Sequence, residues 1–119
     1  MARPIYEVKA EFFKTLAHPA RIRLLEVLSD GELPVNELLP LVGIEPSHLS
    51  QQLAVLRRAG LVRSRRHGSS VIYDVVDRRL FGLLDAAKRI LTTSLTESQD
   101  LLRDLEQLEF ADKKPKRRK

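Results

Sequence analysis

The chain has 119 residues, which is enough for one domain with a single modest core. It contains no cysteine, so disulfides, thiolate metal ligands and cysteine nucleophiles are excluded. No apolar run approaches the ~20 residues of a membrane span, and the first residues lack the apolar segment of a secretory signal. We therefore expect a cytoplasmic protein without a membrane partner.

The net charge of +5 is unevenly distributed along the chain. Residues 112–119 hold six basic residues and one acidic residue, so we expect a folded domain over 1–111 and a basic, disordered tail over 112–119. Residues 57–79 carry seven arginines against two aspartates, whereas 97–109 carry five acidic residues against one arginine. This separation favours a polyanion as the partner of one face.

Helical spacing of apolar residues dominates the first half of the chain. The spacing predicts a helix over residues 5–16. Three further helices are expected where a proline opens the pattern and a glycine closes it. They run from Pro19 to about Asp30, from Pro34 to Val42, and from Pro46 to Ala59-Gly60.

The second half begins with strand-like alternation. Residues 62–66 and 70–75 alternate on either side of His67-Gly68-Ser69, which predicts a β-hairpin. Helical spacing then returns from Asp77 to about Glu109, a helix of ~48 Å if it is continuous. Thr92-Thr93-Ser94 is where it would bend or split. Because little else in the chain can cover this amphipathic helix, dimerisation is favoured.

Three short helices followed by a hairpin form a winged helix-turn-helix order, with the turn at residues 42–45. The fold class is therefore mainly α with a small β-hairpin. In the helix at 46–58, Leu49, Leu53 and Leu56 share one face and belong to the core. The other face carries small, polar and basic side chains, as a helix in the major groove requires. They are Ser47, Gln51, Ala54 and Arg58, with His48 and Ser50 on the flanks.

The hairpin supplies a second set of candidate DNA contacts. Arg63 and Arg65 share one face of its first strand, and Arg66 and His67 adjoin the turn. Such a tip suits phosphate or minor-groove contact, although a solubilising strand edge is an alternative. The predicted DNA-binding residues are Ser47, His48, Ser50, Gln51, Arg58, Arg63, Arg65, Arg66 and His67.

Three stretches resemble the ArsR/SmtB family of bacterial repressors. They are FKTLAHPARIRLL at residues 13–25, SHLSQQLAVLRRAGLV at 47–62 and RRHGSSVIY at 65–73, within a resemblance that covers about residues 10–92. The resemblance implies a homodimer built on the first and last helices, with two recognition helices in successive major grooves. It also implies repression that an inducer relieves, commonly a metal ion.

The metal motifs of that family are incomplete in this chain. Residues 32–38, ELPVNEL, lack both cysteines of the family's cysteine box, and no histidine follows His67 to form a site on the last helix. We therefore assign no metal and no cofactor. A weak site of carboxylates with His18 stays open, although His18 is better explained as a helix-start or packing residue. An effector would be an oxygen-bound metal, an organic ligand or a partner protein.

Together these features predict a homodimeric, sequence-specific DNA-binding transcriptional regulator, a repressor, on a palindromic operator. Its half-sites would lie ~34–36 Å apart. The alternative is a winged-helix interaction module that needs a partner co-regulator and binds DNA weakly alone. An enzyme is not expected, because the sequence has no nucleophile turn, no phosphate-binding glycine loop and no acid pair in a plausible pocket.

Overall fold

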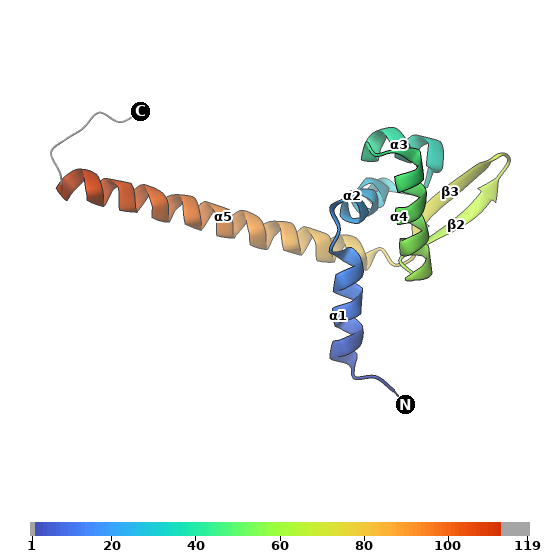
Figure 1. The fold of residues 1–119 in the computed structure, drawn as a ribbon, viewed down its shortest axis with the longest axis horizontal. Coiled ribbons are helices and arrows are strands. Elements are labelled where there is room, and N and C mark those ends of the chain that lie inside the picture. The colour runs from blue at the N-terminus through green and yellow to red at the C-terminus, as the bar shows by residue number, and fades with distance from the viewer. Residues whose placement is uncertain (1, 113–119) are drawn as a thin grey trace. The chain divides into compact units, whose positions relative to one another are not determined.

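The computed structural model describes residues 2–112, which fall into two compact units on either side of the Phe81–Gly82 bond. The first unit holds every element except most of the last helix (Figure 1). In chain order the elements are α1 (Ile5–Leu16), α2 (Pro19–Val27), the 3₁₀ helix η1 (Leu28–Asp30), β1 (Leu33–Pro34), α3 (Val35–Val42), α4 (Pro46–Arg58), β2 (Val62–His67), β3 (Ser70–Val75) and α5 (Arg79–Asp112).

The helix predicted from Pro19 to about Asp30 begins at Pro19, but as an α-helix it ends at Val27, and the 3₁₀ helix η1 covers the last three predicted residues. Pro19 and Pro46 each stand at the first turn of a helix, where a missing N–H costs nothing. His18 caps α2, because its Nδ1 accepts a hydrogen bond from the Ala20 N–H at 3.2 Å. Gly43 ends α3 with a left-handed φ of 77°. The expectation that His18 starts a helix is thus confirmed.

The sheet has three antiparallel strands in the order β1-β3-β2, one more than the predicted hairpin. Pairing of His67 with Ser70 leaves a two-residue turn, and Gly68 takes a φ of 64°, as the first position of a type II′ turn requires. The added strand, β1, pairs Leu33 with Tyr73. Because Pro34 belongs to this strand, α3 starts one residue later than predicted. A two-residue strand is too short to show alternation.

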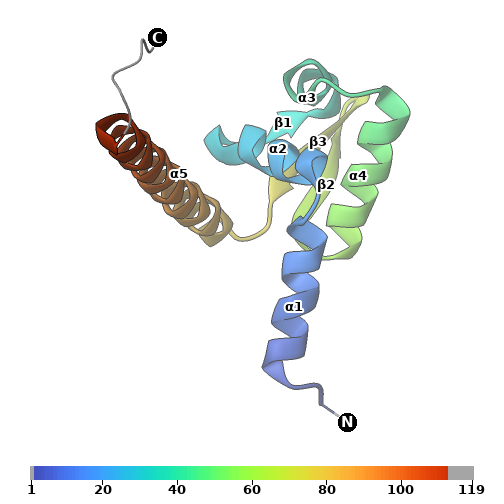
Figure 2. The same ribbon diagram turned by 60° about the vertical axis from the view of Figure 1, so that its left-hand side comes forward.

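Leucines from every helix of the first unit form its core. The apolar residues at most 7% exposed are Leu16, Leu24, Leu25, Leu28, Leu38, Leu49, Leu53, Leu56, Val62, Val75 and Leu80. The stripe predicted for α4 is therefore confirmed. The α4 helix lies alongside the hairpin in both views of the ribbon (Figures 1 and 2). The core thus positions α4 next to the hairpin of β2 and β3.

The last helix, α5, is continuous through residues 92–94, where a break was considered. Asp77 precedes it, and its carboxylate accepts hydrogen bonds from the backbone N–H and the guanidinium of Arg79. Within the second unit Leu83 and Leu84 are half-buried, whereas the leucines further along α5 are exposed, at 60–64% for Leu91, Leu95 and Leu102. No helix among residues 2–112 is both long and apolar enough to cross a membrane. The predicted basic tail lies outside the described residues, except for Asp112.

Candidate DNA-binding surface

The α4 helix has one buried face and one open face. Leu49, Leu53 and Leu56 are at most 2% exposed. On the other side, Ser47, Ser50, Gln51 and Arg58 are all exposed, and the described part of the chain does not cover them. The surface that the sequence predicts for DNA is therefore accessible to it.

A buried polar contact fixes the rotation of α4 about its axis. Gln52 is 7% exposed, and it is the one buried polar side chain among the described residues. Its Oε1 accepts a hydrogen bond from Nε of Arg21 on α2 at 2.7 Å, and Arg21 also donates to the Thr15 carbonyl. Sequence reasoning missed this residue. The indication was a polar residue between Leu49 and Leu53, inside the apolar stripe of the helix.

The predicted site residue His48 is half-buried, and it contacts the start of α2. Its ring meets that of His18 edge to face, with the centroids 6.0 Å apart. This contact places His48 at the border between the open face and the core. Among the described residues there is no group of three or more histidine, cysteine or acidic side chains that would hold a metal ion.

The two faces of the hairpin present different side chains. The Ser64 hydroxyl accepts a hydrogen bond from Nη1 of Arg57, so this face of β2 is turned toward α4. Strand alternation puts Arg66 on the same inner face and Arg63 and Arg65 on the outer one. Arg66 is exposed and makes no ion pair within residues 2–112. The inner face of β2, which carries Arg66, is therefore the face turned toward α4.

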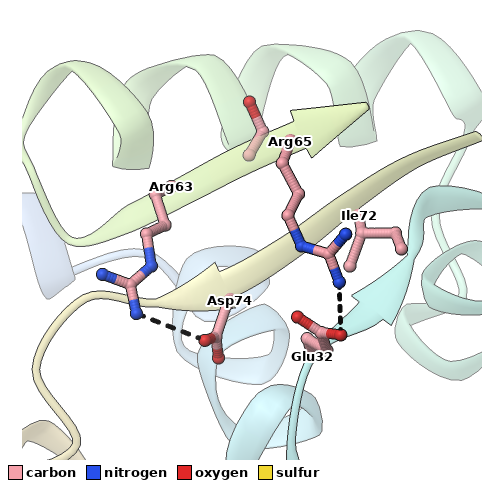
Figure 3. A pocket seen from close by; sticks show the side chains of 6 residues that line it. Glu32, Arg63, Arg65, Ile72 and Asp74 are labelled. Atoms are coloured by element: carbon pink, nitrogen blue, oxygen red, sulfur yellow. Dashed lines mark hydrogen bonds and ion pairs between the residues drawn. The ribbon is translucent and has the colours of Figure 1, made fainter. Parts of the chain in front are cut away.

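Both outer arginines are paired with carboxylates, as Figure 3 shows. Arg63 Nη2 lies 3.6 Å from Asp74 of β3, and Arg65 Nη2 lies 2.6 Å from Glu32, which precedes β1. Both pairs line a pocket of about 180 Å³. The structure therefore does not bring Arg63 and Arg65 together with Arg66, and their carboxylate partners were not predicted.

The remaining predicted residues lie at the ends of these elements. His67 is the last residue of β2 and is exposed beside the turn. Arg58 closes α4, where a positive charge also complements the helix dipole, and it has no ion-pair partner in the described chain. Both side chains are open to a phosphate group.

Comparison with known proteins places this geometry in a family. The model of bacterial regulatory proteins of the arsR family matches residues 18–64, from the cap of α2 into β2. The uncharacterized HTH-type transcriptional regulator Rv0081 of Mycobacterium tuberculosis is 50% identical over 105 residues, 87% of this chain and 92% of that protein.

Solved structures agree with the sequence comparison. The crystal structure of M. tuberculosis Rv0081 has a TM-score of 0.73 at 51% identity and covers 82% of this chain and 98% of that one. The repressor BigR from Xylella fastidiosa has a TM-score of 0.64 at 37% identity, covering 76% and 96%. A homodimeric winged helix-turn-helix DNA-binding domain from Mycobacterium bovis, Mb0332, has 0.64 at 28% identity, covering 71% and 82%. The chain belongs to the arsR family and is a DNA-binding transcriptional regulator rather than an enzyme.

Proposed function

We propose that the chain is a repressor that binds a palindromic operator as a homodimer, with one α4 helix in the major groove of each half-site. The observation that carries the proposal is the open polar face of α4, opposite leucines that are at most 2% exposed. The description of BigR as a repressor and of Mb0332 as a homodimer supports it.

In this proposal the N-terminal half of α4 contacts the bases. The amide of Gln51 can both donate to and accept from an adenine edge, and the hydroxyls of Ser47 and Ser50 suit a base or a phosphate. His48, at the border of the face, contacts the groove edge. Arg58, at the C-terminal end of α4, contacts the DNA backbone.

The hairpin contributes charge. Arg66 and His67 reach the phosphates or the minor groove from the tip. Arg63 and Arg65 lie on the outer face, so they contact DNA only by leaving Asp74 and Glu32. Residues 1–111 are the binding and dimerising unit, and the basic residues of 112–119 add sequence-independent affinity.

Exposed apolar side chains on α1 and α5 support the homodimer. Ile5 and Tyr6 of α1 are 65% and 70% exposed, and the leucines of α5 from Leu91 to Leu105 are exposed. Surfaces of this kind are buried in stable assemblies. No observation in the described residues favours the alternative of an obligate co-regulator.

The test is selection of bound fragments from genomic DNA, followed by footprinting of the selected operator. We expect two symmetric half-sites ~34–36 Å apart. Gln51→Ala should weaken operator binding by about 1–3 kcal/mol and leave binding to a mixed-sequence duplex nearly unchanged. The matched control is Gln107→Ala, the same exchange at an exposed position of α5. Equal losses on both duplexes, or no loss, would contradict base contact by Gln51.

A further inference from the structure

Glu32 contacts a hairpin arginine that lies far from it in the sequence. It stands between η1 and β1, and its Oε2 lies 2.6 Å from Nη2 of Arg65, 33 residues later (Figure 3). A separation this short is typical of a charge-assisted hydrogen bond. No other interaction involves the Glu32 side chain within residues 2–112. Its carboxylate therefore serves Arg65 alone.

The neighbouring pair of Asp74 with Arg63 differs in both respects. Its ion-pair separation is longer, at 3.6 Å. The Asp74 carboxylate also accepts a hydrogen bond from the Val75 N–H at 2.9 Å. Asp74 thus also stabilises its own strand through a backbone hydrogen bond, whereas the Glu32 carboxylate makes no hydrogen bond to the backbone.

The Glu32–Arg65 pair is open to solvent, with side chains that are 47% and 53% exposed. An exposed ion pair is worth little, because water screens it and both side chains lose freedom. A DNA phosphate presents oxygens to the same guanidinium donors that Glu32 now occupies. The phosphate and Glu32 therefore compete for Nη2 of Arg65, and the like charges of the two anions oppose their binding to it at the same time.

From this geometry we infer that Glu32 is an internal competitor of the DNA phosphate for Arg65. The inference rests on the proposed function, in which Arg65 contacts the DNA only by leaving Glu32. In the free protein the carboxylate neutralises the hairpin arginine, and on DNA of any sequence it keeps Arg65 from making a phosphate contact. Glu32 thus limits the sequence-independent part of the affinity, which the phosphate contacts supply.

The experiment measures the affinity of the full chain for a short mixed-sequence duplex by fluorescence anisotropy over a series of salt concentrations. Glu32→Gln should tighten binding about threefold to fivefold, the range that an exposed ion pair can offset. It should also steepen the dependence of log K on log salt by roughly 0.9, the value of one phosphate contact. A purely structural role for Glu32 would not steepen this dependence.

Glu26→Gln is the matched control, because Glu26 is exposed on α2 and makes no ion pair in the described chain. It corrects for the change in net charge. In an Arg65→Gln background, Glu32→Gln should have no more effect than Glu26→Gln, since the contested donor is gone. Thermal unfolding of each variant checks the fold.

Two results would overturn the inference while DNA binding itself persists. One is an effect of Glu32→Gln no larger than that of Glu26→Gln. The other is weaker DNA binding by Glu32→Gln, which would show that the ion pair holds Arg65 in the position that DNA binding requires. A wild-type chain that binds neither this duplex nor any genomic fragment would instead overturn the proposed function, and the inference with it.

Discussion

Neighbouring residues of α4 have separate roles in stability and in binding. Leu56 is fully buried, whereas Arg58, two positions later, is exposed at the helix end. The leucine stripe was predictable because helical spacing alone defines it. The buried Gln52 was not, because its role depends on Arg21 of another helix, 31 residues away. On this one helix, mutations of buried residues should therefore change stability, and mutations of exposed residues should change binding.

Leu56→Ala should lower the free energy of unfolding by about 2–5 kcal/mol, because it removes buried methyl groups and leaves a cavity. Arg58→Ala should change stability by no more than about 0.5 kcal/mol. Urea denaturation measures both values. A comparable loss of stability in the two variants would contradict the division of α4 into a core face and an open face.

Asp77 gives a residue-scale prediction for acid stability. The side chain of Arg79, and then its backbone N–H, lower the pKa of Asp77 from 3.8 to about 2. The folded pKa is thus below the unfolded one, so the stabilisation is present above about pH 3.8 and is lost as the pH falls through 2. Asp77→Asn should therefore lose less stability than wild type between these pH values, as thermal unfolding would measure. Superimposable acid profiles would contradict the assignment.

At the scale of elements, prolines and glycines predicted the starts of α2 and α4 and the end of α3, because both act locally, through a fixed φ or a positive φ. The hairpin was predictable for the same reason. The strand β1 was not, since two residues show no periodicity and their pairing with β3 is a long-range contact. The partners of Arg63 and Arg65 were missed likewise, although their common face followed from alternation.

Two glycines in different elements should respond in opposite directions to alanine. Gly68→Ala should destabilise the chain by about 1–2 kcal/mol, because its φ of 64° is strained for an L-residue. Gly82→Ala should stabilise it by about 0.5–1 kcal/mol, because Gly82 is helical and an added Cβ meets nothing within 4 Å. Chemical denaturation compares the two. A stabilising Gly68→Ala would argue against the type II′ turn.

At the scale of the whole molecule, the continuity of α5 was left open by the sequence, because the run Thr92-Thr93-Ser94 weakens helix propensity without forbidding a helix. The structure resolves this in favour of one 34-residue helix. Its exposed leucines favour association over a monomer in water, because association removes apolar surface from the solvent. A substitution among these leucines therefore tests the proposed dimer.

Leu95→Glu should shift the chain from dimer to monomer in analytical ultracentrifugation, because it places a charge among the exposed leucines of α5. Operator affinity should fall with it, since two linked half-site contacts become one. The charge-matched control is Thr93→Glu, at an exposed position on the opposite side of α5. A dimer that survives Leu95→Glu would place the interface elsewhere.

Gln51 and Gln52 are adjacent and chemically identical, yet one is exposed and the other is held by Arg21 inside the protein. Because the inner glutamine sets the rotation of the helix, the outer face can be rewritten without disturbing it. Sequence preference and folding are thus separable during evolution. A regulator with a new operator would be reached by exchanging Ser47, Ser50 and Gln51 while Gln52 and Arg21 are retained.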